Sequence, residues 1–373
     1  MDFDFSEEQQ LLSDTTRELL ARSYDTEKRR AVLATELGWD RQVWRRLAEL
    51  GVLGLPFEEA DGGAGAGPVE MFAVLVELGR RLVPEPVLDA VYVPGGLIAA
   101  AGSAGQRGEF LPQLASGELL AAFAHAEPGS RWPATAVATT ASRVDDGWVV
   151  TGRKNPVLHG DCAELFVVSA ALPDGGVGLF LVRADAVART GYRTFDGGRG
   201  AQLDLDRSAA VPLGSAVDAI PHIQAADVRA QAGLCAEAFG AMSECLRLTT
   251  EYLKTRKQFG VPLATFQTLT QRAADMYVSL ELAHSMALYA TMSLADGVVD
   301  PIIASRTKLQ VSRSARHIGQ ESIQLHGGIG VTAEYPVGHY VSRLTAIERI
   351  LGSADDHLRV LSARVGDYAM AEL

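Results

Sequence analysis

Strand-like segments occur only in the middle of this 373-residue chain, between two long stretches with helical periodicity. Helical patterns dominate residues 1–117 and 222–373, whereas short β-branched and aromatic runs at regular turn spacing fill residues 118–221. This segregation disfavours a doubly wound sheet, in which strands and helices alternate. The pattern predicts an α+β protein with an N-terminal all-α domain (1–117), a small antiparallel β-domain (118–221) and a C-terminal four-helix bundle (222–373).

Local signals place individual elements within these zones. Ser6 followed by Gln9 is a capping-box pattern that predicts a helix start, and an amphipathic segment around Trp44 stops at Gly51. Further helices are predicted over residues 69–81, 225–257, 266–295 and 301–325. Strands are predicted over residues 148–150, 165–168, 178–182 and 201–205. Glycine and proline in residues 61–68 predict a loop.

The composition excludes several classes of function. With 34 basic and 46 acidic residues, the formal net charge is −12, which argues against nucleic acid or an anionic membrane as the main partner. No apolar run reaches the roughly 18 to 20 residues of a membrane span, and residues 1–5 lack the features of a secretory signal. The three cysteines show no C-x-x-C spacing, which predicts reduced thiols and no metal site. A cytoplasmic protein is therefore expected.

Two segments in the last zone stand out from the helical background. Residues 252–260 (Tyr-Leu-Lys-Thr-Arg-Lys-Gln-Phe-Gly) close a predicted helix, and alone they fit a basic helix terminus with a glycine stop. Residues 324–334 (Gln-Leu-His-Gly-Gly-Ile-Gly-Val-Thr-Ala-Glu) alone fit a tight interhelical turn. Gly328 begins a G-x-G-x-x-A pattern, but a helix precedes it, so no Rossmann site is predicted. His326 is expected to pack or to hydrogen-bond to the turn.

Together, the two segments resemble signature sequences of the acyl-CoA dehydrogenase family. Residues 3–9, 266–267 and 274–276 also match, and the α–β–α order agrees with that family's architecture. The resemblance implies a flavoprotein oxidoreductase of lipid metabolism that uses FAD to form an α,β double bond in an acyl-CoA thioester. In that reaction a carboxylate removes the α-proton, hydride leaves the β-carbon for the flavin, and an electron-transfer acceptor reoxidises the flavin.

The resemblance also implies which residues bind the cofactor. In this family, the positions of Arg256, Gln258 and Phe259 meet the FAD of a neighbouring subunit. Those of Gln324 and Gly328 serve the adenosine side of the same flavin. A permanently charged guanidinium is chemically suited to a pyrophosphate.

The family's catalytic base is missing from its usual place. In most members a glutamate directly precedes a glycine shortly after the second segment, and here Leu351 precedes Gly352. Other members carry the base on the helix before the first segment, where counting reaches Ala230 or Val228. None of these side chains accepts a proton.

The segments that would hold this chain's own flavin also depart from the family pattern. Ala126 replaces the threonine of a Thr-Glu-Pro-Gly loop, and residues 131–133 interrupt the pattern beyond that loop. Residues 156–158 (Pro-Val-Leu) replace the Trp-Ile-Thr that backs the flavin ring. Beyond Gly352, residues 355–356 are both aspartates, which would repel a pyrophosphate.

Three hypotheses remain open. The favoured one is the non-catalytic subunit of a heteromer, because the sequence resembles the base-less subunit of actinobacterial acyl-CoA dehydrogenases of steroid side-chain catabolism. Its partner would be a homologous subunit that carries the glutamate, in an α2β2 heterotetramer that acts on an acyl-CoA. The second hypothesis is a self-sufficient enzyme that uses Glu348 or Asp227 as a relocated base. The third is a flavin-free interaction or scaffold protein on the same fold.

Overall fold

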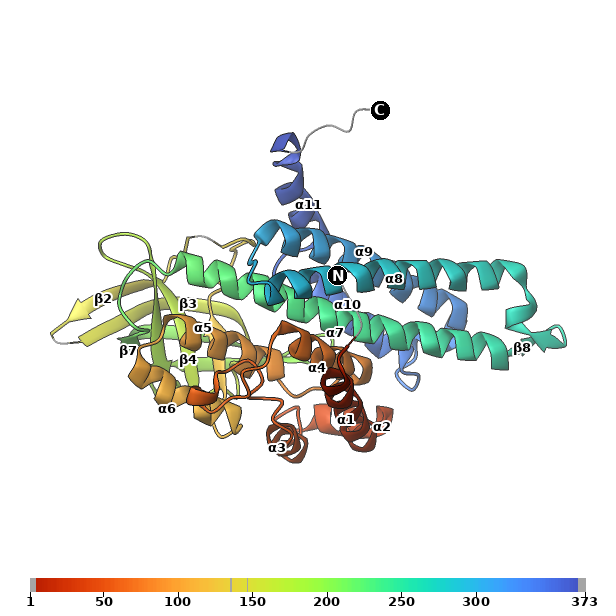
Figure 1. Cartoon of the computed structure of the whole chain (residues 1–373), viewed down its shortest axis with the longest axis horizontal. Helices are drawn as coiled ribbons and strands as arrows, with labels where there is room; N and C mark the ends of the chain where they lie inside the picture. Colours follow the sequence, from red (N-terminus) through yellow and green to blue (C-terminus); the bar gives the residue numbers. More distant parts are fainter. Residues whose placement is uncertain (1–4, 135, 146, 368–373) are drawn as a thin grey trace. The chain divides into compact units, whose positions relative to one another are not determined.

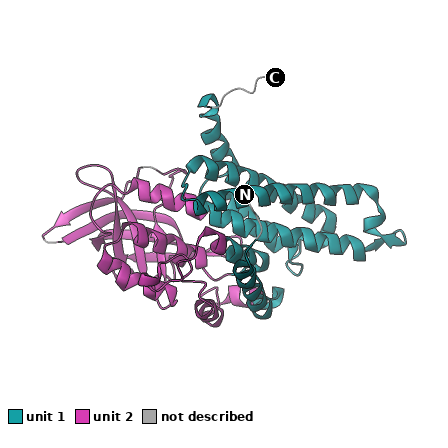
Figure 2. Ribbon diagram, viewed as in Figure 1, with its two compact units in different colours: residues 1–28, 72–83, 231–373 teal, residues 29–71, 84–230 magenta. Residues whose placement is uncertain are grey.

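The computed structural model describes residues 5–134, 136–145 and 147–367 (Figure 1). Residues 3 and 4, which belong to the family-like opening, lie outside this part. The order of elements confirms the predicted α+β class, with helices on either side of a central block of strands. The chain forms two compact units, residues 1–28, 72–83 and 231–373 in one and residues 29–71 and 84–230 in the other (Figure 2). The proposed three-domain division stays a prediction.

The first zone contains helices of modest length with clear start signals. Its α-helices are α1 (Glu7–Ser23), α2 (Thr26–Ala34), α3 (Arg41–Glu49), α4 (Pro68–Arg81), α5 (Val93–Ala101) and α6 (Ala104–Ala115). The predicted capping box is confirmed, because the Ser6 hydroxyl accepts from the Gln9 N–H and the Gln9 side chain accepts from the Ser6 N–H. Asp40 caps α3, which buries Trp44 and Leu47. Sequence therefore places α1, α3 and α4 well.

The larger sheet lies in the second unit and is mostly antiparallel. Its strands are β1 (Ala121–Ala124), β2 (Thr140–Val144), β3 (Gly147–Leu158), β4 (Leu165–Ala171), β5 (Val177–Arg183), β6 (Ala188–Arg193) and β7 (Arg199–Pro212). The strand order is β1-β4-β2-β3-β7-β5, with β6 paired to β7. Two pairings, β1 with β4 and β2 with β4, are parallel. A core of alanine, valine, leucine and phenylalanine side chains fills this sheet, and α5 packs against β1.

Strand β3 is longer than its sequence indicates. It runs through Pro156, and the pairing with β7 shifts register between Lys154 and Val157. A bulge of this kind accommodates a proline, which has no N–H to donate to the ladder. The short strand prediction at 148–150 therefore covers only the beginning of β3.

Long helices form most of the first unit. They are α7 (Ile220–Thr255, of which residues from 231 onward belong to this unit), α8 (Gln267–Ala295), α9 (Pro301–His326), α10 (Val337–Arg349) and α11 (Ala354–Ser362). Helices α4 and α7 approach very closely, because a Cβ at Gly79 would lie 2.0 Å from the Glu237 carbonyl oxygen. A Cβ at Gly240 would lie 1.9 Å from the Val76 carbonyl oxygen. Glycine is thus required on both sides of this helix pair.

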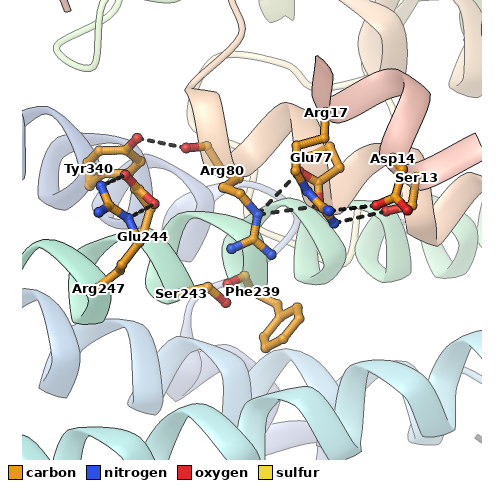
Figure 3. A network of polar contacts seen from close by, with 10 residues as sticks. All are labelled: Ser13, Asp14, Arg17, Glu77, Arg80, Phe239, Ser243, Glu244, Arg247 and Tyr340. Atoms are coloured by element: carbon orange, nitrogen blue, oxygen red, sulfur yellow. Dashed lines mark hydrogen bonds and ion pairs between the residues drawn. The ribbon is translucent and has the colours of Figure 1, made fainter. Parts of the chain in front are cut away.

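A buried carboxylate connects helices within this unit (Figure 3). The Glu77 side chain on α4 is 1% exposed and binds the Arg17 guanidinium of α1 at 3.0 and 3.1 Å. Arg80 donates to the same carboxylate at 3.2 Å, and the Tyr340 hydroxyl of α10 donates to the Arg80 carbonyl oxygen at 2.7 Å. Two arginines compensate the charge of Glu77, so its burial is tolerated.

Candidate functional site

The first motif comprises the last residues of α7 and the hairpin that follows this helix. Helix α7 ends at Thr255, and strands β8 (Lys257–Gln258) and β9 (Val261–Pro262) follow it. The turn residues Phe259 and Gly260 have φ of 53° and 82°. Positive φ at both central positions is the geometry of the two-residue turn that suits a twisted hairpin. The expected end of a helix within this motif is confirmed at Thr255, whereas Gly260 belongs to the hairpin turn and does not stop the helix.

This hairpin presents the three predicted cofactor residues to solvent. The side chain of Phe259 is 91% exposed, although its ring meets that of Phe266 edge-on at 6.2 Å. Arg256 and Gln258 are also exposed, and within the described residues the Arg256 guanidinium has no ion pair. Figure 1 shows the hairpin at the tip between α7 and α8. The hairpin turn accounts for the positive φ of Phe259, and the side chain of this residue stays accessible to solvent.

Gly328 of the second motif is not explained by packing within the described chain. Gln324 and Gly328 are exposed at the end of α9 and in the 3-10 turn Gly327–Val331. A Cβ at Gly328 would meet no heavy atom within 4 Å. A Cβ at Gly330 would lie 3.0 Å from the His326 Cβ. Packing within the described chain therefore explains Gly330 but not Gly328.

His326 has the packing and hydrogen-bonding role that the sequence predicts. Its Nδ1 lies 2.7 Å from the Ser322 carbonyl oxygen, and its Nε2 lies 3.2 Å from the Tyr335 hydroxyl. Its ring lies between those of Tyr252 and Tyr335, with centroids 4.5 and 4.8 Å away. Burial lowers the pKa of His326. Because Tyr252 begins the first motif, this contact joins the two motifs.

Leu351, where the resemblance places the family's base, lies in the turn between α10 and α11. Leu351 has φ of 54° and Gly352 has φ of 97°. The Leu351 carbonyl oxygen lies 3.0 Å from the His357 Nε2 and 3.5 Å from the Gln231 Nε2. An aliphatic side chain therefore occupies a well-defined backbone position.

Glu348 forms ion pairs and a hydrogen bond with the backbone near the start of α11. Its side chain is 9% exposed, pairs with the Arg349 Nε at 2.8 Å, and lies 4.0 Å from the Arg316 guanidinium. Its Oε1 also accepts from the Ala354 N–H at 3.1 Å, at the start of α11. These contacts give Glu348 a part in holding the start of α11.

Asp227 is the other carboxyl group considered as a relocated base. It lies in the part of α7 that belongs to the second unit. Burial raises the pKa of Asp227 to about 6, and a hydrogen bond from the Trp132 side chain partly offsets this. Trp132 belongs to the three residues that interrupt the flavin-loop pattern. A desolvated carboxyl with a raised pKa is a candidate base.

A buried ion pair, which sequence reasoning missed, holds the loop at residues 126–129 that resembles the family's Thr-Glu-Pro-Gly loop. The Lys154 ammonium is fully buried and donates to the Glu127 carboxylate at 2.8 Å, the Ser169 hydroxyl at 3.1 Å and the His125 carbonyl oxygen at 3.2 Å. Glu127 also accepts from the Ala138 and Thr139 N–H groups. Burial opposes ionisation of Glu127, but these hydrogen bonds lower its pKa to about 2. Glu127 of this loop therefore takes part in a hydrogen-bond network within the chain.

A cluster that includes one cysteine was also missed. Potential ligand atoms of His159, Asp161 and Cys162 lie within 4.8 Å of one another. Arg199 pairs with the Asp161 carboxylate at 2.7 Å and would compete with any cation. Burial raises the pKa of the Cys162 thiol to about 11, so the thiol is protonated at neutral pH. The expectation of no metal stays a prediction.

The two aspartates after Gly352 have different surroundings. Ser353 is the N-cap of α11, and Asp356 completes the capping box, because its carboxylate accepts from the Ser353 N–H at 2.9 Å and from the Ser353 hydroxyl at 2.6 Å. Asp355 lines a cavity of about 380 Å³ together with Arg313 and Arg316 of α9. Arg313 and Arg316 partly offset the charge of Asp355 there, although Arg316 also lies 4.0 Å from the Glu348 carboxylate.

None of the helices in the described part of the chain combines the length and the apolarity that a bilayer crossing needs.

Comparisons with known proteins cover nearly the whole chain. Residues 6–118 match the model of the acyl-CoA dehydrogenase N-terminal domain, and residues 228–366 match that of the C-terminal domain. Acyl-CoA dehydrogenase IpdE2 of Mycolicibacterium smegmatis is 30% identical over 96% of this chain and 99% of its own length. Acyl-CoA dehydrogenase FadE27 of Mycobacterium tuberculosis is 30% identical over 98% and 99%.

Solved structures agree with these relatives. The Tcur3481-Tcur3483 steroid ACAD G363A variant matches with a TM-score of 0.89 and 32% identity, over 97% of this chain and 98% of that chain. The ChsE4-ChsE5 complex from Mycobacterium tuberculosis matches with a TM-score of 0.89 and 27% identity, over 99% and 100%. The chain belongs to the acyl-CoA dehydrogenase family.

Proposed function

We propose that this chain is the non-catalytic subunit of a heteromeric, FAD-dependent acyl-CoA dehydrogenase. The observation that carries the proposal is Leu351, an aliphatic side chain at the position of the family's catalytic glutamate. Two similar solved structures, the ChsE4-ChsE5 complex and Tcur3481-Tcur3483, support an assembly of unlike chains. Tcur3481-Tcur3483 is named a steroid ACAD, which supports a steroid-type acyl-CoA as the substrate.

The chemistry requires a base that residue 351 cannot supply. Desaturation next to a thioester requires a base at the α-carbon and an acceptor for the β-hydride. FAD supplies the hydride acceptor. Leucine has no proton acceptor, so a homologous partner subunit would supply the glutamate. An α2β2 assembly, a separate electron acceptor and a cytoplasmic location complete the proposal.

The two motifs would contribute to the partner's flavin. Arg256 would pair with the pyrophosphate, while Gln258 and Phe259 would contact the cofactor from the same hairpin. Gln324 and Gly328 would contact the adenosine side. These residues fit the cofactor because they are exposed and have few contacts with their own chain. Surface positions with no internal role are those expected of a binding face.

Purification of this chain with and without a homologous partner tests the proposal. The isolated chain should have little activity on acyl-CoA thioesters, and the co-purified pair should be yellow and active. Arg256→Ala should weaken flavin retention by the pair roughly tenfold to hundredfold, as expected for a lost charge-assisted hydrogen bond. Lys254→Ala, another exposed cation at the end of α7, is the matched control. Strong activity of the isolated chain, or a colourless pair, would contradict the proposal.

The raised pKa of Asp227 supports a second candidate, a self-sufficient enzyme with a relocated base. In that case Asp227→Asn should abolish turnover by the isolated chain, because asparagine cannot accept the α-proton. Glu348→Gln serves as the comparison and should retain turnover. Full activity of the Asp227→Asn variant would exclude this candidate.

A further inference from the structure

Three buried polar side chains surround the turn between α10 and α11. They are Gln231 of α7, Lys308 of α9 and His357 of α11, and we call them the turn frame. Their residues are 2%, 0% and 0% exposed, respectively. All three donate to backbone carbonyl oxygens of the turn, and Lys308 also donates to carbonyl oxygens in the last turn of α10. Helices that are far apart in sequence therefore converge on a few peptide groups.

Lys308 makes the most demanding of these contacts. Its ammonium donates to the carbonyl oxygens of Ile347 at 2.7 Å, Gly352 at 3.2 Å and Glu348 at 3.3 Å. Within the described residues it has no ion pair with a carboxylate. Burial of an unpaired cation is costly, and it lowers the pKa of Lys308 to about 8. A helix such as α10 can end with a glycine at its C-terminus, which costs less free energy than burying a lysine there.

Gln231 and His357 hold the turn from the side of Leu351. The imidazole Nε2 lies 3.0 Å and the amide Nε2 3.5 Å from the carbonyl oxygen of this residue. Leu351 has φ of 54°, a left-handed conformation that is unfavourable for a residue other than glycine. Backbone strain of this kind persists only where surrounding contacts enforce it.

We infer that Gln231, Lys308 and His357 are positioning residues that fix the orientation of the side chain at residue 351. Lys308 holds the peptide groups before and after this residue, and the other two hold its own carbonyl group. The inference rests on the proposed function only where it interprets residue 351 as the place of the base. The side chain that the turn frame orients in this chain is that of Leu351.

Hydrogen exchange of the full-length chain tests the frame directly. Lys308→Met removes the ammonium and keeps a side chain of similar length. Backbone amides of residues 350–357 should then exchange at least about tenfold faster, while those of α8 should not change. Lys254→Met, at an exposed position of α7, is the control. Gln231→Leu provides a milder variant if Lys308→Met does not fold, and the same region should exchange faster.

The orientation of the side chain needs its own measurement. In leucine-methyl-labelled protein, the Leu351 signals are identified by their loss in Leu351→Ile. They should broaden or shift in Lys308→Met and Gln231→Leu, whereas distant leucine signals should stay unchanged. Unchanged Leu351 signals and exchange rates in a folded variant would overturn the inference, as would uniform acceleration over the whole chain. Both measurements use the isolated chain without flavin, so failure of the proposed function would leave them interpretable.

Discussion

The ring of Tyr252 lies 4.5 Å from the ring of His326, and this contact joins the end of α7 to the end of α9. Each residue belongs to one of the two motifs that resemble flavin-contacting sequences. Tyr252, His326 and Tyr335 form one aromatic cluster, to which both motifs contribute a residue. Substitution within this cluster should therefore affect both segments.

Replacement of the histidine tests this coupling. His326→Leu removes the hydrogen bond to Tyr335 and the aromatic contact with Tyr252, at a cost of about 1 to 3 kcal/mol in the free energy of unfolding. Urea denaturation measures this cost. Tyr335→Phe removes only the hydroxyl and should cost no more than about 1 kcal/mol. Equal stability of His326→Leu and the unmodified chain would show that the cluster contributes nothing.

Substitutions of Gly328 and Gly330 test flavin binding and internal packing separately. Gly328→Ala should leave the free energy of unfolding within about 0.5 kcal/mol of the original, because the added Cβ meets no heavy atom within 4 Å. The same change should reduce the flavin content of the co-purified pair. Gly330→Ala should cost about 1 to 3 kcal/mol, because its Cβ would crowd His326. The prediction fails if Gly328→Ala retains flavin normally or if it destabilises the isolated chain as much as Gly330→Ala.

Lys308 predicts a specific dependence of stability on pH. Burial lowers its pKa from 10.5 to about 8. Between these values the unfolded chain holds a proton that the native chain has released, so this group makes the free energy of unfolding rise with pH. Lys308→Met should remove up to about 3 kcal/mol of that rise. Denaturation of both proteins between about pH 7.5 and about pH 10 checks the slope, and parallel curves would contradict the prediction.

Asp227 predicts the opposite slope in acid. Burial raises its pKa from 3.8 to about 6, so between these values the native chain holds a proton that the unfolded chain has released. This group makes the free energy of unfolding fall as pH rises through that window. Asp227→Asn should be more stable than the original above pH 6, by about 1 to 2 kcal/mol after allowance for partial exposure. A stability difference that does not change with pH would show that Asp227 titrates normally.

The sequence predicts the long helices well because periodicity and caps act locally. Helices α8 and α9 begin and end within one residue of their predicted limits. Strand β6 was missed because it is an edge strand with mostly exposed side chains, so no alternation marks it. The hairpin after α7 was missed because its basic residues also suit a helix terminus.

The cofactor positions came from resemblance, whereas the turn frame became visible only in three dimensions. A signal for Lys308 existed, since it follows Ala304 by four residues and precedes Val311 by three on the buried face of α9. Lys154 had no such signal, because its partner Glu127 is distant in sequence. Hydrogen bonds between distant segments leave no local pattern in a single sequence.

The ratio of flavin to protein in the co-purified pair tests the central claim most directly. Visible absorbance and amino-acid analysis give this ratio without any assumption about the substrate. If this chain serves only the flavin of its partner, each pair of unlike chains should hold one FAD, and the isolated chain should hold none. Two FAD molecules for each pair, or a stable stoichiometric flavin in the isolated chain, would contradict the claim.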